Sequence, residues 1–350
     1  MIENPIGIIE SLFRDEVFVE RDLVIDSSAS TTTFTCKNVL SKGDDYYNNA
    51  EKFNATAALK YYVTDYVGST NTFTINTSLA SMVDDNFYLT NVQGDYKIDD
   101  VSFDAAEATR SDWIFARSLN TKQSVQSLVD ELLFESHCIL FESADEDSGY
   151  TKLKIKSLDK DTSVDFATWT APLFGQTGGK IEQVKSSLTD LGQVYTSYKL
   201  FYHYDYGKGD YLKTLTVDKN GSTVGDYYKN LCRQAEQTYR INNPFVYSSN
   251  WIYDDDTAEE FLKKKMLFYG EQRLTVKWST PLCSGGSYNY LTVEIGDQGT
   301  LETDPKYLPN GYDSTGSALT SHLFMVIGKE IVTNPQGTPH IVFTLLDLGI

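Results

Sequence analysis

Long segments of alternating apolar and polar residues, rich in tyrosine, phenylalanine, threonine and valine, constrain the fold more than any other feature of this sequence. The two longest are residues 193–206 and the segment YLKTLTV, which a YGKGD turn separates. Alternation places successive side chains on opposite faces of a strand, and aromatic and β-branched residues favour such half-buried surfaces. The pair therefore predicts a β-hairpin, and the similar segment at residues 272–280 predicts a further strand.

Composition supports a folded, strand-rich protein. The 350-residue chain contains 24 tyrosines and 18 phenylalanines, and 41% of its residues are hydrophobic, which is near the average for globular proteins. A disordered chain would have a much lower hydrophobic fraction. The length indicates two or three packed units. We predict an α+β, β-rich fold with a few short helices.

The charge argues against several classes of protein. The formal net charge is −19, whereas binding to nucleic-acid backbones depends on an excess of Lys and Arg. No apolar stretch approaches the ~18 residues that a membrane-spanning helix requires. The amino terminus has acids where a secretion signal carries Lys or Arg. We therefore expect synthesis in a cytoplasm, without stable membrane insertion.

Capping residues predict a helix at the start of the chain. Asn4 is a favourable N-cap, and Pro5 suits the first helical position. Apolar residues then recur at helical spacing, so we predict a short amphipathic helix over residues 5–16.

Two further helices are predicted in the second half of the chain. Asp226 opens one near residues 226–239. The other is predicted over residues 257–269, with Asp256 as its N-cap and Gly270 at its end.

No motif in the sequence indicates catalysis or cofactor binding. It has no GxSxG elbow, no phosphate-binding loop and no GxGxxG between a strand and a helix. The histidines and cysteines have neither CxxC nor HExxH spacing, so we predict no metal site, no cofactor and no catalytic residues, and we expect that the protein is not an enzyme. These residues are His137, His203, His322, His340, Cys36, Cys138, Cys232 and Cys283.

The run Asp254, Asp255, Asp256 has two interpretations. Clustered carboxylates can bind calcium through their oxygens. Acids also favour the N-terminus of a helix, and this capping role is the preferred interpretation. Whether a calcium ion is bound stays open.

Large aromatic residues are the candidate structural anchors. We expect Trp113, Phe115, Trp251 and Trp278 to lie in hydrophobic cores or at subunit contacts, with burial in a core the more common outcome.

Several short segments, taken in order, resemble the tail-hub or tail-tip proteins, also called baseplate-hub proteins, of tailed bacteriophages and gene transfer agents. The resemblance covers most of residues 1–24 and 98–350. The segments that carry it are the NPxxII helix with Asn4, Pro5, Ile8 and Ile9; FDA at 103–105; SDWIFARSLN at 111–120 with SLVDELLFES at 127–136; LKIKSL at 153–158; the segment from Trp251 to Trp278; and HIVFTLLDL at 340–348.

The resemblance implies a structural virion protein at the tail tip. Such proteins form a ring, commonly a homotrimer, in which each subunit contributes two tail-tube-like β domains. They join the tail tube to the tip and fibre proteins and form part of the DNA ejection channel. The implied partners are copies of the chain itself, the tail tube or a distal tail protein, the tape-measure protein and tip or fibre proteins, with DNA only as passing cargo.

The resemblance also implies a division into domains. Residues 1–26 and 98–192 would form a first hub α+β domain, and residues 193–350 a second tube-like β domain of the sandwich or barrel type. Residues 27–97 lie outside the resemblance and read as an inserted small β module. In the family a further domain precedes the opening helix, and either another protein supplies it here or the ring closes differently.

Two alternatives stay open at this point. Surface aromatics and paired acids are also typical of a host-polysaccharide-binding or -hydrolysing tail protein. The module at residues 27–97 could alone bind a receptor or sugar. For the ring itself, we expect the strands at 193–206 and 272–280 to offer exposed edges that neighbouring subunits cover.

Overall fold

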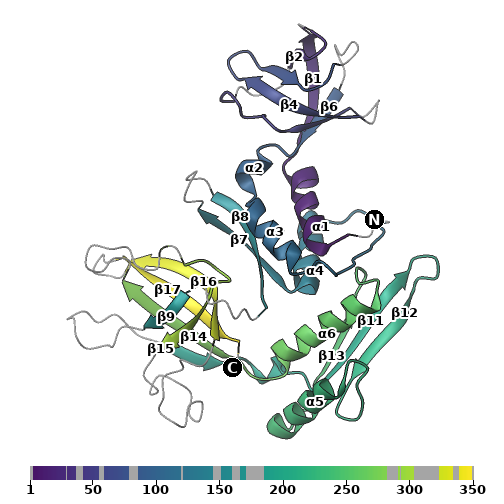
Figure 1. The fold of residues 1–350 in the computed structure, drawn as a ribbon, viewed down its shortest axis with the longest axis vertical. Helices are drawn as coiled ribbons and strands as arrows, with labels where there is room; N and C mark the ends of the chain where they lie inside the picture. The colour runs from purple at the N-terminus through teal and green to yellow at the C-terminus, as the bar shows by residue number, and fades with distance from the viewer. Residues whose placement is uncertain are drawn as a thin grey trace. The chain divides into compact units, whose positions relative to one another are not determined.

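The computed structural model groups the chain into two compact units, residues Met1–Lys156 and Ser157–Ile350. Its fold is α+β and rich in strands, which confirms the predicted fold class (Figure 1). The structure describes residues 3–28, 30–36, 42–54, 59–78, 86–119, 121–144, 151–159, 166–170, 185–281, 291, 293–302, 323–333 and 339–348.

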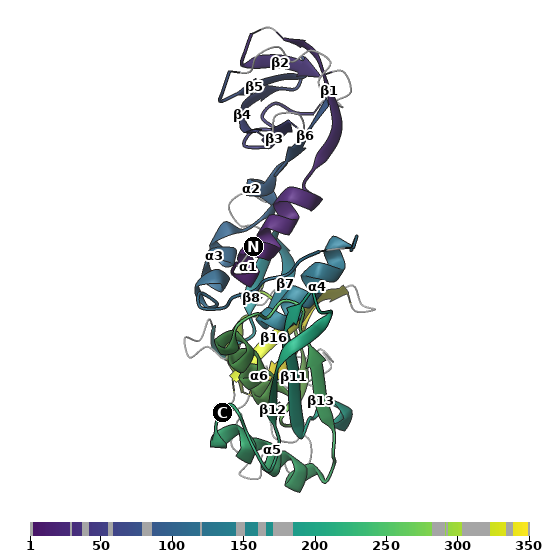
Figure 2. The ribbon, with the colours of Figure 1, turned by 90° about the vertical axis from the view of Figure 1, so that its right-hand side faces the viewer.

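A closed β-barrel lies within the first unit. Its strand order is β1-β2-β5-β4-β3-β6, and pairing of β6 with both β3 and β1 closes the ring (Figure 2). Closure gives every strand two neighbours, so the barrel has no free edge. The strands are β1 (Glu20–Ser28), β2 (Thr33–Cys36), β3 (Glu51–Asn54), β4 (Leu59–Val67), β5 (Thr72–Ile75) and β6 (Asn86–Thr90).

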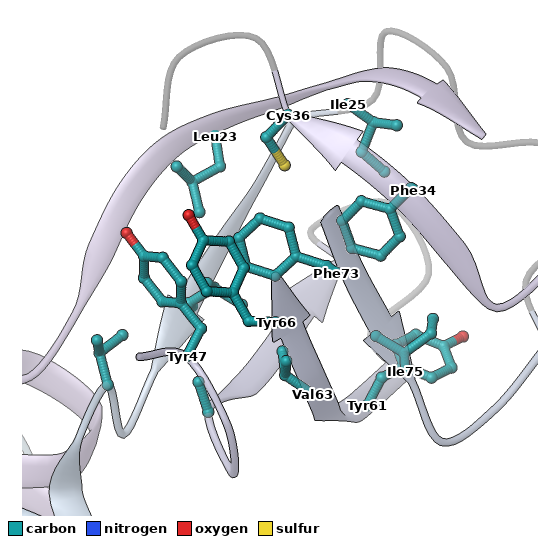
Figure 3. Packing of buried hydrophobic residues seen from close by; sticks show 13 residues of the cluster. Leu23, Ile25, Phe34, Cys36, Tyr47, Tyr61, Val63, Tyr66, Phe73 and Ile75 are labelled. Atoms are coloured by element: carbon teal, nitrogen blue, oxygen red, sulfur yellow. The ribbon is translucent and has the colours of Figure 1, made fainter. Parts of the chain in front are cut away.

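Aromatic side chains fill the barrel (Figure 3). In β2 and β5, threonines alternate with buried residues, so the phenylalanines point inward. The rings of Phe34 and Phe73 stack with centroids 5.5 Å apart. Tyr47 and Tyr66 complete the cluster, with centroids 5.1 and 4.7 Å from that of Phe73. All four side chains are fully buried, so this core is complete within the chain.

Helices and a short hairpin make up the rest of the first unit. The opening helix is α-helical only as far as Leu12, and a π-helical turn follows, where the sequence predicted an α-helix as far as residue 16. Strands β7 and β8 pair with each other. The elements are α1 (Pro5–Leu12), η1 (Phe13–Val17), α2 (Gly94–Lys97), α3 (Asp100–Ala108), α4 (Val125–Ser136), β7 (Cys138–Ala144) and β8 (Thr151–Ser157).

The second unit contains a three-stranded sheet of order β12-β11-β13. β11 and β12 form the predicted antiparallel hairpin, and β13 pairs with β11 in parallel. Helices α5 and α6 pack on one face of this sheet (Figures 1 and 2). The elements are η2 (Leu191–Gln193), β11 (Ser197–Asp205), β12 (Asp210–Val217), α5 (Asp226–Tyr239), β13 (Pro244–Ser248) and α6 (Asp255–Tyr269).

A six-stranded sheet of order β10-β14-β17-β16-β15-β9 completes the second unit. Its longest pairings are those of β17 with β14 and β16. The strands are β9 (Phe166–Thr170), β10 (Lys185–Leu188), β14 (Leu274–Pro281), β15 (Gln298–Glu302), β16 (Leu323–Thr333) and β17 (Pro339–Asp347).

The expectation about exposed strand edges was wrong in its particulars. The segments at 193–206 and 272–280 become β11 and β14, and each lies between two partner strands. Long alternating segments bury one face and form many ladder bonds, which favours interior positions. In the described parts of the two sheets, the edge strands are instead β12, β13, β10 and β9.

Candidate interaction surface

Asn4 joins the opening helix to the segment that follows α3. Its Oδ1 accepts a hydrogen bond from the Ile6 backbone N–H at 2.9 Å, so it caps α1 as the sequence predicted, with Pro5 at the first turn. Its Nδ2 donates to the Arg110 carbonyl at 2.7 Å and to the Glu107 carbonyl at 3.3 Å. One side chain therefore both starts a helix and fixes it to residues more than one hundred positions away.

Arg110 is a central residue that no pattern in the sequence indicates. Its side chain is almost fully buried, and Nε donates to the Ser136 carbonyl at the end of α4 at 2.7 Å. Its guanidinium carbon lies 5.0 Å from the centre of the Trp113 ring, within cation–π range. Trp113 and Phe115 are buried, and Phe115 pairs with Glu3 through two backbone hydrogen bonds of 3.1 Å. The only available signal was an arginine three residues before a tryptophan, which is too common to predict burial.

The N-cap of α6 is Asp254, which corrects the prediction of Asp256. Oδ1 of Asp254 accepts from the Thr257 backbone N–H at 2.9 Å, and the Asp254 backbone is extended, as at an N-cap. Three acids in a row fit the capping pattern equally well, so the sequence could not select among them. Asp256 lies exposed in the first turn, where its charge still favours the helix dipole.

Gly270 ends α6, but not through a left-handed conformation. Its φ is −73°, and its N–H donates to the Met266 carbonyl at 2.9 Å. A Cβ at this position would lie only 2.6 Å from that carbonyl oxygen. Glycine is required here because of this close approach.

The other two predicted anchors lie in the second unit. Trp278 of β14 is fully buried and stacks on Phe343 of β17 with centroids 5.5 Å apart. Trp251 is buried in the segment that precedes α6. The side chains of Trp251 and Trp278 thus lie in the interior of this unit.

The structure gives no metal site among the residues it describes. Within those ranges, no three His, Cys, Asp or Glu side chains are grouped to hold an ion. Cys36, Cys138 and Cys232 are buried, and burial raises the pKa of the Cys232 thiol to about 11. Cys283 and His322 lie outside the described residues. Across the described ranges, no helix is long and apolar enough to cross a membrane.

The free face of the three-stranded sheet is a candidate surface for contacts. Leu200 of β11 is fully buried beneath the helices. Neighbouring side chains point the other way: Lys199 is exposed, and Val246, opposite it on β13, is 58% exposed. Within the second unit, no other described element packs on this sheet as α5 and α6 do.

Tyrosine rings cluster where β11 and β12 meet. Tyr204 lies with its ring centre 5.0 Å from those of both Tyr206 and Tyr211, at interplanar angles of 82° and 63°. The Tyr211 hydroxyl donates to Asn250 Oδ1 at 2.9 Å. We call the end of this hairpin and the adjoining segment, residues 203–213 and 253–256, the hairpin patch.

His203 connects the two segments of the hairpin patch. Its φ is +58°, which is uncommon for a residue other than glycine, and its N–H donates to the Ile252 carbonyl at 3.0 Å. Nδ1 lies 2.8 Å from the Tyr253 carbonyl, which can only accept, so Nδ1 carries the proton. The ring stacks on Tyr253 with centroids 4.1 Å apart. His203 therefore has a positioning role in this patch.

Asp255 joins the hairpin patch to the sheet. Its Oδ1 accepts hydrogen bonds from Lys213 Nζ and the Tyr202 hydroxyl, both at 2.7 Å. The hydrogen bond from Lys213 is the main cause that lowers the pKa of Asp255, and the hydrogen bond from Tyr202 is the next. Burial is the main cause that raises the pKa of Tyr202, and its hydrogen bond to Asp255 is the next. Asp255 is consequently engaged in a structural ion pair, a role other than the calcium binding considered from the sequence.

Comparisons with known proteins give weak likenesses to phage tail proteins. No protein family model and no curated protein matches the sequence. The chain is similar in structure to a tail protein from Neisseria meningitidis MC58, with 11% identity, a TM-score of 0.37, and coverage of 94% of this chain and 96% of that chain. It is also similar to the 43 kDa tail protein of prophage MuSo2 from Shewanella oneidensis, with 8% identity, a TM-score of 0.35 and coverage of 93% of each chain. TM-scores of this size do not establish a shared fold.

Proposed function

We propose that this chain is a structural protein of a phage tail and acts as a tail hub at the distal end of the tail. In this role it forms a ring, joins the tail tube to tip or fibre proteins, and forms part of the DNA ejection channel. The proposal includes no catalytic step.

The observation that carries the proposal is the junction around Asn4. The segments that resemble tail-hub proteins lie far apart in the sequence, yet Asn4 of the opening motif bonds to Arg110, beside SDWIFARSLN. Phe115 of that same segment pairs with Glu3. Their packing supports interpreting the resemblance as one folded element, because unrelated chance matches would not be expected to contact each other.

The free face of the β12-β11-β13 sheet supports a role in assembly. Within the second unit, helices cover one face of this sheet, so the other face, which carries the exposed Val246, is available to a neighbouring subunit. The edge strands β12 and β13 are further places where another chain could pair. We place the contacts between ring subunits here, and the contacts with fibres or a neighbouring ring on the barrel.

The test is imaging of intact particles at a resolution that allows the chain to be traced, combined with light scattering of the purified protein. The proposal predicts a symmetric ring at the tail tip, with interfaces above ~1,000 Å². Val246→Glu should prevent ring formation, while Thr64→Glu on the exposed outer surface of β4 should not. A chain that is absent from particles would refute the proposal.

The barrel can be tested separately. Particles whose hub lacks the barrel should still assemble if the barrel only contacts fibres or host, and adsorption should then fall. Failure of the ring to form without the barrel would instead place it in the subunit interface.

A further inference from the structure

The hairpin patch is unusual because large apolar side chains are exposed beside many carboxylates. Tyr206 is 38% exposed, Leu212 48% and Tyr253 42%. Aromatic residues are enriched in the energetically dominant parts of protein interfaces. The patch is therefore built like a contact surface.

The patch carries a strong negative charge. It contains five aspartates and two lysines. Both lysines are already paired, Lys208 with Asp205 at 3.6 Å and Lys213 with Asp255 at 2.7 Å. Asp256 is exposed and makes no hydrogen bond or ion pair within the described part of the chain. The net field attracts cations and repels phosphates.

Local hydrogen bonds favour the charged form of two of the carboxylates, those of Asp205 and Asp255. The Gly207 and Lys208 backbone N–H groups bond Oδ1 of Asp205 at 2.9 and 3.2 Å and lower its pKa. Lys213 and Tyr202 do the same for Asp255. These two carboxylates consequently stay charged well below neutral pH.

The arrangement of the aromatic side chains argues against a sugar-binding site. A pyranose stacks on an open, flat aromatic face. Here Tyr204 and Tyr206 meet edge to face, at 82°, and one face of Tyr253 is covered by His203. Isolated ring faces beside carboxylates suit a compact cation, which can lie over a single ring.

We propose that the hairpin patch binds a basic segment of a protein partner, through lysine or arginine side chains placed over the tyrosine faces and paired with the exposed carboxylates of Asp210 and Asp256. The complementary charge identifies the partner as basic, and the pairing of ring and carboxylate favours arginine over lysine. This inference goes beyond the hub proposal and does not depend on it, because the patch lies on one hairpin and its adjoining segment.

The experiment measures binding of the full-length protein to the peptide Ac-GRGRGRG-NH2 by calorimetry at two salt concentrations. A peptide with glutamate in place of arginine controls for peptide backbone binding. Because the whole protein is acidic, the first pair of variants leaves its net charge unchanged. Tyr206→Leu together with Tyr253→Leu should weaken binding about threefold per ring, whereas the matched Tyr→Phe pair should bind as the wild type does.

A second pair of variants tests the carboxylates. Asp256→Asn should weaken binding and reduce its salt dependence, while Asp104→Asn, an exposed aspartate of α3, should leave both unchanged. Circular dichroism verifies that each variant is folded. If all variants bind the arginine peptide equally well, the peptide is held by the negative charge of the whole protein and not by the hairpin patch. That result would overturn the proposal.

Glycan binding is the other outcome to examine. Maltoheptaose and an N-acetylglucosamine hexamer are titrated into the same proteins. Glycan affinity that falls in the Tyr→Leu pair, without an effect on the arginine peptide, would identify a sugar site and overturn the proposal. Imaging of the tail tests the hub proposal, whereas peptide binding tests the hairpin patch. The two proposals can therefore fail separately.

Discussion

The barrel and the three-stranded sheet differ in how completely their strands are paired and covered. In the barrel each strand has two neighbours, and the aromatic core is sealed inside. In the sheet only β11 has two neighbours among the described strands, and helices cover one face. The barrel thus satisfies its own backbone and buries its own rings, whereas the sheet leaves an edge and a face for another molecule. Stability should therefore concentrate in the barrel's interior, and association on the sheet.

The largest expected effect is the loss of an aromatic ring inside the barrel. Phe73 is fully buried and contacts the rings of Phe34, Tyr47 and Tyr66. Phe73→Ala removes these contacts and leaves a cavity, so it should lower the free energy of unfolding of the barrel by about 3–5 kcal/mol. Denaturant unfolding, with hydrogen exchange to assign the loss to barrel strands, measures it. A cost below about 1 kcal/mol would mean that the barrel core is not closely packed.

The next effect compares the two faces of the three-stranded sheet. Leu200→Ala, beneath the helices, should cost about 2–4 kcal/mol. Val246→Ala, on the free face, should change the free energy of unfolding by less than about 0.5 kcal/mol. The same Val246 change should instead weaken self-association, as sedimentation would show. Equal stability costs would indicate that both faces are covered within the chain.

The sequence predicts strand content well where alternation is strict. The hairpin of β11 and β12 and the inward phenylalanines of the barrel follow from side-chain alternation alone. Capping chemistry likewise located the start of α1 at Asn4. Helix α5 also begins at Asp226 as predicted, although Gly225 occupies its N-cap position and no side chain caps it. These features are local, so a short window of sequence contains their cause.

Features that depend on long-range pairing were not predictable. Nothing local shows that β11 and β14 lie inside their sheets, because strand order depends on which distant segments pair. Burial of Arg110 depends on the carbonyl of Ser136, which only the fold brings near. The hairpin patch was not predictable for the same reason, since only the tertiary fold brings Tyr253 against His203 and Asn250 against Tyr211.

A smaller effect tests which aspartate caps α6. Asp254→Ala removes the acceptor of the Thr257 N–H and should lower the free energy of unfolding by about 1 kcal/mol. Asp256→Ala should cost well under half as much, because it removes only a favourable charge in the first turn. Urea unfolding of the two variants side by side gives the comparison. The reverse order would restore Asp256 as the cap and move the helix start by two residues.

The smallest effect concerns Asp255, which links α6 to the edge strand β12. Lys213 and then Tyr202 hold its pKa below the ordinary 3.8, so the folded protein binds this proton less readily than the unfolded chain does. Its contribution to stability is therefore present above that ordinary value and is lost as pH falls through the lower pKa of the folded state. Because the carboxylate is exposed, the contribution is small and should shrink further in salt. Asp255→Asn should lower stability slightly at neutral pH and not at about pH 2, whereas Asp256→Asn, with no such partners, should show no comparable difference. If Asp255→Asn behaves identically at both pH values, the ion pair contributes nothing, and β12 is held by its ladder with β11 alone.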